Sequence, residues 1–172
     1  QGENRILYYE SGRGCPFRCS YCLSSIEKQV RLRSLGLVKR ELRCFLERKV
    51  KQVKFIDRTF NCNRDHAEKI WRFLLENDNG VTNFHFEISA ELLTEEQLEL
   101  LSGMRPGLIQ LEIGVQTTNR KALQTIHRHA DPEKLKKAVM SVSGFRNIRQ
   151  HLDLIAGLPW EGLESFRRSF NE

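Results

Sequence analysis

The sequence has no apolar run long enough to cross a membrane. No stretch approaches the roughly 18 to 20 consecutive apolar residues of a transmembrane helix, and the N-terminus lacks the apolar centre of a secretory signal peptide. Internal repeats, low-complexity tracts and interdomain linkers are absent as well. These absences predict a cytoplasmic protein with a single globular domain over residues 1–172.

The chain also lacks a continuous basic stripe, although its formal net charge is +6. Its 28 Lys and Arg residues are scattered and mixed with 22 acidic residues, as is usual for solvated helix faces. Two further uses of the charge remain open, which are contact with RNA and attraction of an acidic electron-transfer partner. Charge alone therefore identifies no partner.

Cysteines are too few and too unevenly placed for a disulfide framework. An odd number favours metal ligation in a reducing compartment, and the five are Cys15, Cys19, Cys22, Cys44 and Cys62. The first three follow the apolar run at residues 6–9 with the spacing CxxxCxxC. Because iron-sulfur and zinc sites normally use four ligands, three close cysteines predict a centre with one open position. A partial zinc site is an alternative at this point.

Strand and helix patterns alternate along the chain, which predicts βαβ units and a parallel sheet. Strands are expected at about residues 5–10, 52–57, 83–89, 108–116 and 148–156. Helices are expected at 37–50, around the apolar positions Ala67, Ile70, Trp71 and Leu74, after the capping box at 94–97, after Asp131-Pro132, and at 163–170. With right-handed crossovers, these units form an open sheet or an arc of a barrel.

Alternation within the strands favours the barrel. In the strand at 108–116 one face is apolar and the other carries Gln110, Glu112, Gly114 and Gln116, and the strands at 83–89 and 148–156 alternate in the same way. Parallel strands buried on both faces would be almost continuously apolar, so the polar faces predict a ligand-binding lumen. We therefore expect an α/β protein, a partial (β/α) TIM-like barrel with about five βα units.

Ligands of α/β folds bind beyond the C-terminal ends of the strands. The cysteine loop, Asp57, Glu87, Gln116 and Asp153 all fall at or near such ends, so we expect them to share one cavity. Cys44 lies off the apolar stripe of the first helix, and we expect it outside that cavity.

Together these features resemble the core of radical S-adenosylmethionine (SAM) enzymes. The CxxxCxxC spacing, with Tyr21 directly before the last cysteine, is similar to that family's cluster motif. The subgroup of similar proteins includes oxygen-independent coproporphyrinogen oxidase, methylthiotransferases and, with the closest resemblance, cobalamin-binding radical SAM proteins. The segments that carry the likeness are residues 8–11, 55–61, 112–117, 126–128 and 153–159.

The resemblance implies a role for each matching residue. Cys15, Cys19 and Cys22 would ligate a 4Fe-4S cluster, and SAM would take the fourth iron. Residues 57–59 replace the family's Gly-Gly-Glu motif, and the carboxylate of this segment would bind the methionyl amino group of SAM. Asp57 and Thr59 belong to this replaced motif. Of the remaining residues, Tyr21, Ile155 and Gly157 would contact the adenine, and Glu87 and Gln116 would contact polar groups of SAM. Arg128 would bind the SAM carboxylate, and Asp153 would contact the ribose or the active-site network.

In that family one electron from the reduced cluster cleaves SAM to methionine and a 5′-deoxyadenosyl radical. The resemblance thus implies an enzyme that modifies an unknown substrate and takes electrons from a donor such as flavodoxin or ferredoxin. Five of the usual six βα units are recognisable, and no cobalamin-binding region precedes Tyr8. We expect an excised piece of a longer protein, with missing flanking segments that select the substrate. Any cobalamin would belong to the parent protein, which would in that case be a cobalamin-dependent methyltransferase.

Two other functions are compatible with the residues. One is a zinc-stabilised module that contacts RNA through the cysteine loop and the region of Arg31 and Arg33. The other is a radical SAM fold without catalysis, because a fold does not establish an activity. The intact set of three cysteines argues against the second.

Overall fold

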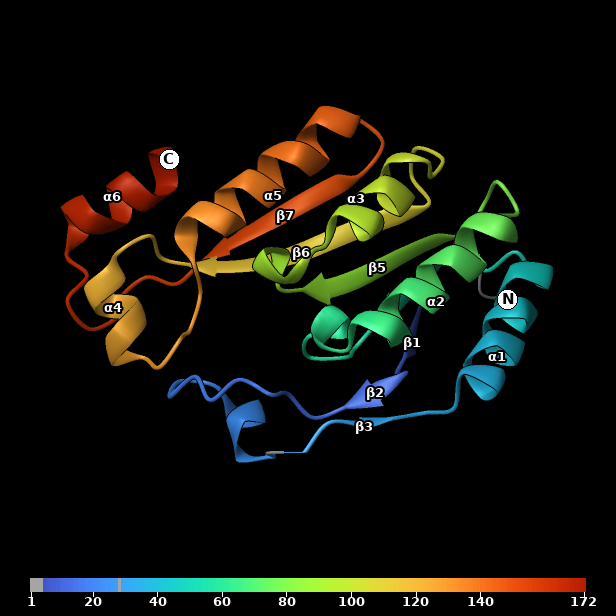
Figure 1. Cartoon of the computed structure of the whole chain (residues 1–172), viewed down its shortest axis with the longest axis horizontal. Coiled ribbons are helices and arrows are strands. Elements are labelled where there is room, and N and C mark those ends of the chain that lie inside the picture. The colour runs from blue at the N-terminus through green and yellow to red at the C-terminus, as the bar shows by residue number, and fades with distance from the viewer. Residues whose placement is uncertain (1–4, 28) are drawn as a thin grey trace.

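The structure is a computed structural model that describes residues 5–27 and 29–172. Its centre is a sheet of five parallel strands (Figure 1), formed by β1 (Ile6–Tyr9), β4 (Gln52–Phe55), β5 (Asn83–Ile88), β6 (Ile109–Gln116) and β7 (Arg149–Leu154). Their order in the sheet is their order in the chain. Consecutive neighbours of this kind form an arc of a barrel, which confirms the predicted α/β partial barrel.

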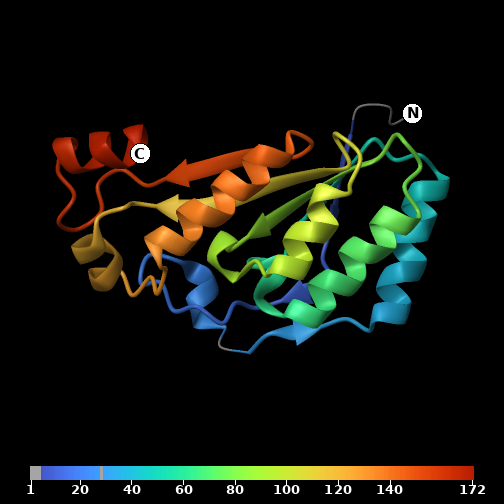
Figure 2. The ribbon, with the colours of Figure 1, turned by 45° about the horizontal axis from the view of Figure 1, so that its top comes forward.

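Four helices cover one face of the sheet (Figure 2): α1 (Leu35–Glu47), α2 (Arg64–Glu76), α3 (Glu95–Ser102) and α5 (Pro132–Phe145). Two more helices, α4 (Arg120–Thr125) and α6 (Leu163–Asn171), lie beyond the C-terminal ends of β6 and β7 (Figure 2). Within the described ranges, no helix has the length and apolar character needed to cross a bilayer.

Helix α2 shows why the apolar spacing produces this packing. Ala67, Ile70, Trp71 and Leu74 fall on one side of the helix, and each has an exposed fraction of 0%. The Trp71 ring meets Phe86 of β5 edge to face, with 6.0 Å between ring centroids. Full burial of a large apolar side chain contributes about 1.5–3 kcal/mol, so this face holds the helix against the sheet.

The helix starts follow the predicted caps. Thr94 and Gln97 form the complete capping box of α3. Asp131 accepts hydrogen bonds from the first N–H groups of α5, and Pro132 occupies the first turn. Strand ends are shorter than expected, and β4 ends at Phe55 rather than at Asp57. That difference changes where the Asp57 side chain points.

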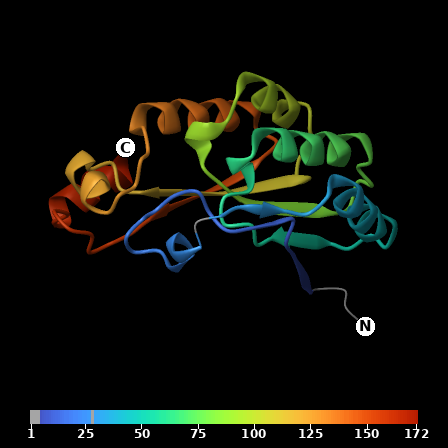
Figure 3. The ribbon, with the colours of Figure 1, turned by 60° about the horizontal axis from the view of Figure 1, so that its bottom comes forward.

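The cysteine segment joins β1 to α1. It contains the antiparallel pair β2 (Gly12–Arg13) and β3 (Arg31–Leu32) and the 3-10 turn η1 (Leu23–Ile26). Figure 3 shows this turn on the side of the sheet away from α2, α3 and α5. The segment therefore lies against the face that carries the polar residues of the strands.

The apolar face of β7 is only partly covered. Leu152 of this face lines an apolar pocket with Leu135 of α5 and Phe170 of α6, but its exposed fraction is 49%. The helix that follows, α6, packs instead on the loop after β6, where the Ser169 hydroxyl accepts a hydrogen bond from the Thr118 N–H at 3.0 Å. Leu152 therefore lies on the helix side of the sheet, where α5 and α6 cover it only in part.

Candidate active site

A polar cavity of about 210 Å³ lies between the cysteine loop and the C-terminal ends of the strands. Its wall combines the loop after β1, the segment after β4, and residues of β5, β6 and β7 or of the loops that follow them. The predicted site residues that line it are Cys15, Cys19, Tyr21, Cys22, Thr59, Glu87, Gln116, Arg128 and Asp153. Folding therefore brings together residues that are far apart in the sequence.

The three motif cysteines face this common cavity, whereas Cys44 lies on α1 and does not line it. The Sγ atom of Cys15 lies 3.4 Å from Oγ1 of Thr59, so the loop contacts the segment after β4. Among the residues that the structure describes, no group of three His, Cys, Asp or Glu side chains is arranged around a single-ion site. The thiols of Cys15, Cys19 and Cys22 are nevertheless the ligand type of an iron-sulfur cluster.

Two contacts hold the loop over the sheet. The backbone N–H of Ser20 donates to the carbonyl of Ile126 at 2.9 Å. The guanidinium of Arg128 lies over the Phe17 ring, 5.2 Å from its centroid, and such cation-π contacts contribute about 0.5–2 kcal/mol. The segment after α4 therefore positions the loop and also supplies the arginine of the site.

Arg128 is buried, with an exposed fraction of 9%, and has unused bonding capacity. Its Nη2 donates to the Ser89 hydroxyl and the Gly114 carbonyl, both at 3.3 Å, and lies 3.5 Å from a carboxylate oxygen of Glu91. Its Nε and the Glu91 oxygens are buried without a hydrogen-bond partner among the described residues. An unmade buried hydrogen bond costs about 1–3 kcal/mol, and Arg128 also lines the cavity, so its guanidinium is the cationic donor that an anionic ligand group would meet there.

The lumen face beneath the cavity carries a charged network. Glu87 of β5 and Glu112 of β6 are opposite each other in register. Lys54 of β4 lies 2.8 Å from the Glu112 carboxylate and 3.8 Å from that of Glu87. The Nε2 atom of His85 lies 3.0 Å from the same oxygen of Glu112, although without hydrogen-bond alignment.

These contacts shift the pKa values of the Glu87 and Glu112 carboxyl groups in opposite directions. Burial, reinforced by the charge of Glu112, raises the pKa of Glu87. Burial opposes ionisation of Glu112 too, but the hydrogen bond and charge of Lys54 outweigh it and lower the Glu112 pKa. Burial and the nearby Lys54 lower the pKa of His85. The Glu112 carboxylate is therefore paired with Lys54, while the Glu87 carboxyl can ionise when a cation enters the cavity.

Asp57 does not line the cavity, so the prediction that it shares this space was wrong. Its carboxylate accepts hydrogen bonds from the Ser11 N–H at 3.0 Å and from the Ser11 hydroxyl at 2.7 Å. The side chain is buried, and burial raises its pKa against the effect of these bonds. Because β4 ends before Asp57, the carboxylate turns toward the chain after β1 and stabilises it.

Ile155 and Gly157 also lie outside the cavity wall. Ile155 packs on a small apolar cluster formed by Ala122, Leu123, Ile126 and Leu158. Gly157 has a φ of +83°, a left-handed conformation that glycine adopts without strain. Gly157 shapes the turn between β7 and α6, whereas the Ile155 N–H donates a hydrogen bond to the carbonyl of the cavity residue Gln116 at 2.9 Å.

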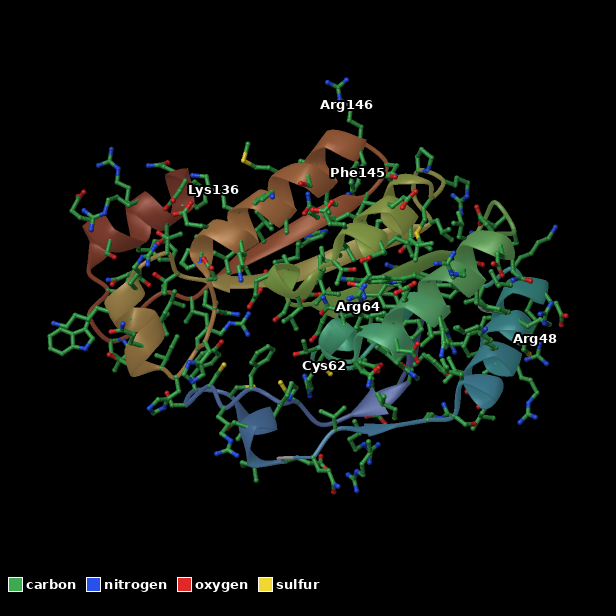
Figure 4. All side chains as sticks on the ribbon, viewed as in Figure 1. Arg48, Cys62, Arg64, Lys136, Phe145 and Arg146 are labelled. Carbon is green, nitrogen blue, oxygen red and sulfur yellow. The ribbon has the colours of Figure 1, made fainter. Side chains whose placement is uncertain are left out.

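Sequence reasoning missed several residues of the site. Phe17, Arg58 and Ser89 line the cavity, and Glu91 pairs with Arg128. Lys54 could have been found, because it has the polar parity of its strand. Cys62 is the last residue of the turn η2 (Phe60–Cys62), which begins directly after Thr59, and it is labelled near the centre of Figure 4. Burial, reinforced by the nearby Cys15 thiol, raises the pKa of Cys62.

Comparison with known proteins agrees with this geometry. The family model described as "Radical SAM superfamily" matches residues 9–172. A comparison with curated proteins finds no match. Among solved structures, the radical SAM methyltransferase TsrM from Kitasatospora setae, with tryptophan substrate and a SAM analogue bound, matches with a TM-score of 0.83 at 18% identity, over 98% of this chain and 33% of that one.

Two further structures have the same fold over 96% of this chain. The cobalamin-dependent SAM radical enzyme OxsB, with aqua-cobalamin bound, has a TM-score of 0.75 at 19% identity. SuiB from Streptococcus suis has a TM-score of 0.71 at 13% identity. The chain covers 26% of OxsB and 35% of SuiB, so it spans about a third or less of the length of the structures that it resembles.

Proposed function

We propose that this chain, which belongs to the radical SAM superfamily, carries the core that uses a 4Fe-4S cluster to cleave SAM reductively. The observation that carries the proposal is the common cavity of Cys15, Cys19, Cys22 and Arg128. Three thiolates leave one position open on a cluster, and the buried arginine offers a donor to the carboxylate of a ligand at that position. The residues present therefore fit both cofactors that the family implies.

Each cavity residue has a proposed task. Cys15, Cys19 and Cys22 ligate the cluster, and Tyr21 borders the adenine of SAM. The guanidinium of Arg128, which lines the cavity, binds the carboxylate of SAM, because a guanidinium matches a carboxylate in shape and charge. The cluster and SAM, when bound, supply one-electron cleavage and radical formation.

The acidic residues complete the SAM site. In place of Asp57, which is occupied by Ser11, we assign Glu87 to the methionyl ammonium. A cation there would ionise the Glu87 carboxyl, whose pKa burial raises. Gln116 and Thr59 donate or accept at the polar edges of SAM, and Asp153 lies at the ribose or in the network beside it. Together these side chains exclude water and orient the cofactor.

For the whole protein we infer a cobalamin-dependent methyl transfer. The support is that OxsB is a cobalamin-dependent enzyme and TsrM a methyltransferase. Regions outside residues 1–172 would bind cobalamin and select the substrate, and a flavodoxin or ferredoxin would donate the electron.

Anaerobic reconstitution with iron and sulfide tests the proposal. Cys19→Ser should abolish the visible absorbance and the EPR signal of the cluster, because it removes one of three thiolates. Cys44→Ser is the matched control, and it should leave both unchanged because Cys44 lies on α1 outside the cavity. Dithionite and SAM should then yield 5′-deoxyadenosine in the wild type and the control only.

The zinc-stabilised RNA-contacting module is distinguished in the same preparations. Stoichiometric zinc by elemental analysis, no cluster after reconstitution, and no 5′-deoxyadenosine would contradict the radical SAM activity. A cluster that survives Cys19→Ser would contradict the assigned ligands while leaving the family intact.

A further inference from the structure

A second hollow, of about 810 Å³, lies at the other end of the sheet. Residues at or next to the N-terminal ends of all five strands line it, from Ile6 in β1 to Arg149 in β7. The strand β6 spans Ile109 at this end to Gln116 at the cysteine cavity. At about 3.3 Å per residue, the two sites are roughly 20 Å apart, so this hollow is not part of the SAM site.

The charges around this N-terminal hollow have one sign. Its lining includes Arg5, Lys51, Arg146 and Arg149 and no acidic residue. Figure 4 shows Arg146 at the end of α5, projecting from the edge of the molecule. In the described part of the chain, none of the four forms an ion pair.

Some basic side chains elsewhere on the surface pair with acidic ones. Arg64 pairs with Glu96 at 2.7 Å, and Lys69 pairs with Asp65 at 2.7 Å. The N-terminal hollow differs from these sites because its four cations share one lining that contains no acidic residue. A concave surface lined by one sign of charge focuses the electric field and concentrates ligands of the opposite sign. The four cations repel one another until an anion reduces that repulsion.

The volume of the hollow and the hydrogen-bond donors in its wall limit the kinds of ligand that it can bind. The volume falls in the range of about 300–1,000 Å³ typical of small-molecule sites. Three of the four cations are arginines, whose planar fork matches phosphate oxygens. Side-chain amides of Gln52 and Gln110 and the apolar side chains of Ile6 and Ile109 complete the wall. These groups suit a ligand with both a polyanionic part and a less polar part.

We propose that the N-terminal hollow binds a phosphate-bearing ligand of nucleotide size. The four cations come from three separate stretches of sequence, near residues 5, 51 and 146–149, and the sheet places them around one space. The site is independent of the cluster and of SAM. Its occupancy can therefore be measured whether or not the proposed radical chemistry is correct.

The test is calorimetric titration of the full-length protein with two probes, ATP and inorganic pyrophosphate, at low and at high salt. Arg146→Asn with Arg149→Gln removes two charges while Asn tolerates the left-handed backbone of residue 146, where φ is 59°. We expect saturable binding that weakens with salt, and a loss of about tenfold for each arginine contact removed. The matched control is Lys137→Gln with Arg167→Gln, two exposed residues outside the hollow, which should bind both probes as the wild type does.

Three results would overturn the proposal. They are the absence of saturable binding of either probe, equal weakening in the control variant, and tighter binding of a poly-glutamate peptide than of ATP. The last would assign the hollow to an acidic protein segment. Circular dichroism checks folding, and Arg5→Gln with Lys51→Gln repeats the test from the opposite side of the hollow. Cluster absorbance and 5′-deoxyadenosine formation should stay unchanged in every variant, so failure here differs from failure of the SAM site.

Discussion

Replacement of Lys54 by Met should destabilise the fold and change the titration of the lumen. The Nζ atom lies 2.8 Å from Glu112 and 3.8 Å from Glu87, and the exposed fractions of the Lys54, Glu112 and Glu87 side chains are 23%, 29% and 28%. Met retains a flexible apolar side chain that fills similar space. The substitution therefore removes the charge and its hydrogen bond with little loss of packing.

The expected loss is about 1–2 kcal/mol in the free energy of unfolding at neutral pH. Two unit charges about 4 Å apart attract by about 4 kcal/mol at an effective dielectric constant of 20, and desolvation and side-chain ordering offset much of this. Without Lys54, the facing carboxylates of Glu87 and Glu112 repel each other. Their pKa values should both rise, because a neutral carboxyl relieves that repulsion.

The pH dependence has a defined sign. In the wild type the Glu112 pKa is lowered from 4.5, so its stabilising contribution is present above the unfolded pKa and is lost as pH falls through the lower folded value. Loss of Lys54 removes that contribution. The difference in stability between wild type and variant should therefore be largest near neutral pH and should shrink as the solution becomes acidic.

Urea unfolding, followed by Trp71 fluorescence, measures both effects, because Trp71 is fully buried in α2. The matched control is Lys69→Met, which breaks a pair with Asp65 at 2.7 Å on the exposed face of the same domain. Exposed pairs contribute about 0.2–1 kcal/mol, so the control should lose less. Equal losses in the two variants, or a Lys54 difference that stays constant as pH falls, would refute the reasoning.

Four further substitutions, at three positions, test other parts of the structure by the same urea measurement. Asp57→Asn should cost about 1–3 kcal/mol, because the Ser11 N–H and hydroxyl lose a carboxylate acceptor. Because the folded-state pKa of Asp57 is raised from 3.8, the free energy of unfolding of the wild type falls as pH rises above that value. The variant should lack this fall. Arg128→Gln should cost about 3–5 kcal/mol, since it leaves the Glu91 carboxylate buried and unpaired, and Arg128→Lys should lose less. Phe86→Ala should cost about 3–5 kcal/mol through the cavity it leaves in a fully buried aromatic cluster; a loss below 1 kcal/mol would mean that the cluster collapses around the gap.

Local patterns in the sequence predict most of the fold. The positions of Ala67, Ile70, Trp71 and Leu74 require a helix with one buried face, and that face is buried. The capping box at Thr94 depends only on residues within one turn, so the sequence alone locates the start of α3. Strand parity likewise predicts that Glu87 and Gln116 face the cavity. Period and capping act over a few residues, which is why they can be read without coordinates.

The direction of a side chain just beyond a strand is less predictable. Asp57 has the residue type and the approximate position of a cavity carboxylate, but β4 ends two residues before it and the strand parity no longer applies. The position of Ser11, more than forty residues earlier, then decides where the carboxylate binds. Leu152 is a similar case, because its exposure depends on where α6 packs rather than on its own strand.

The sequence by itself determined α1, α2, α3, α5 and α6, the five parallel strands, their order and the cysteine motif, because each depends on periodicity or spacing within a short segment. It did not predict α4 or the pair β2 and β3. Only the tertiary structure decided which distant groups meet. Arg128 and Glu91 form a buried pair, and Lys54 joins Glu112 across the sheet. The basic N-terminal hollow is the clearest example, because its cations are scattered among acids along the chain and come together at one end of the parallel strands. Charge interactions depend on the distance between the groups in space, and the separation of two residues along the chain does not determine that distance.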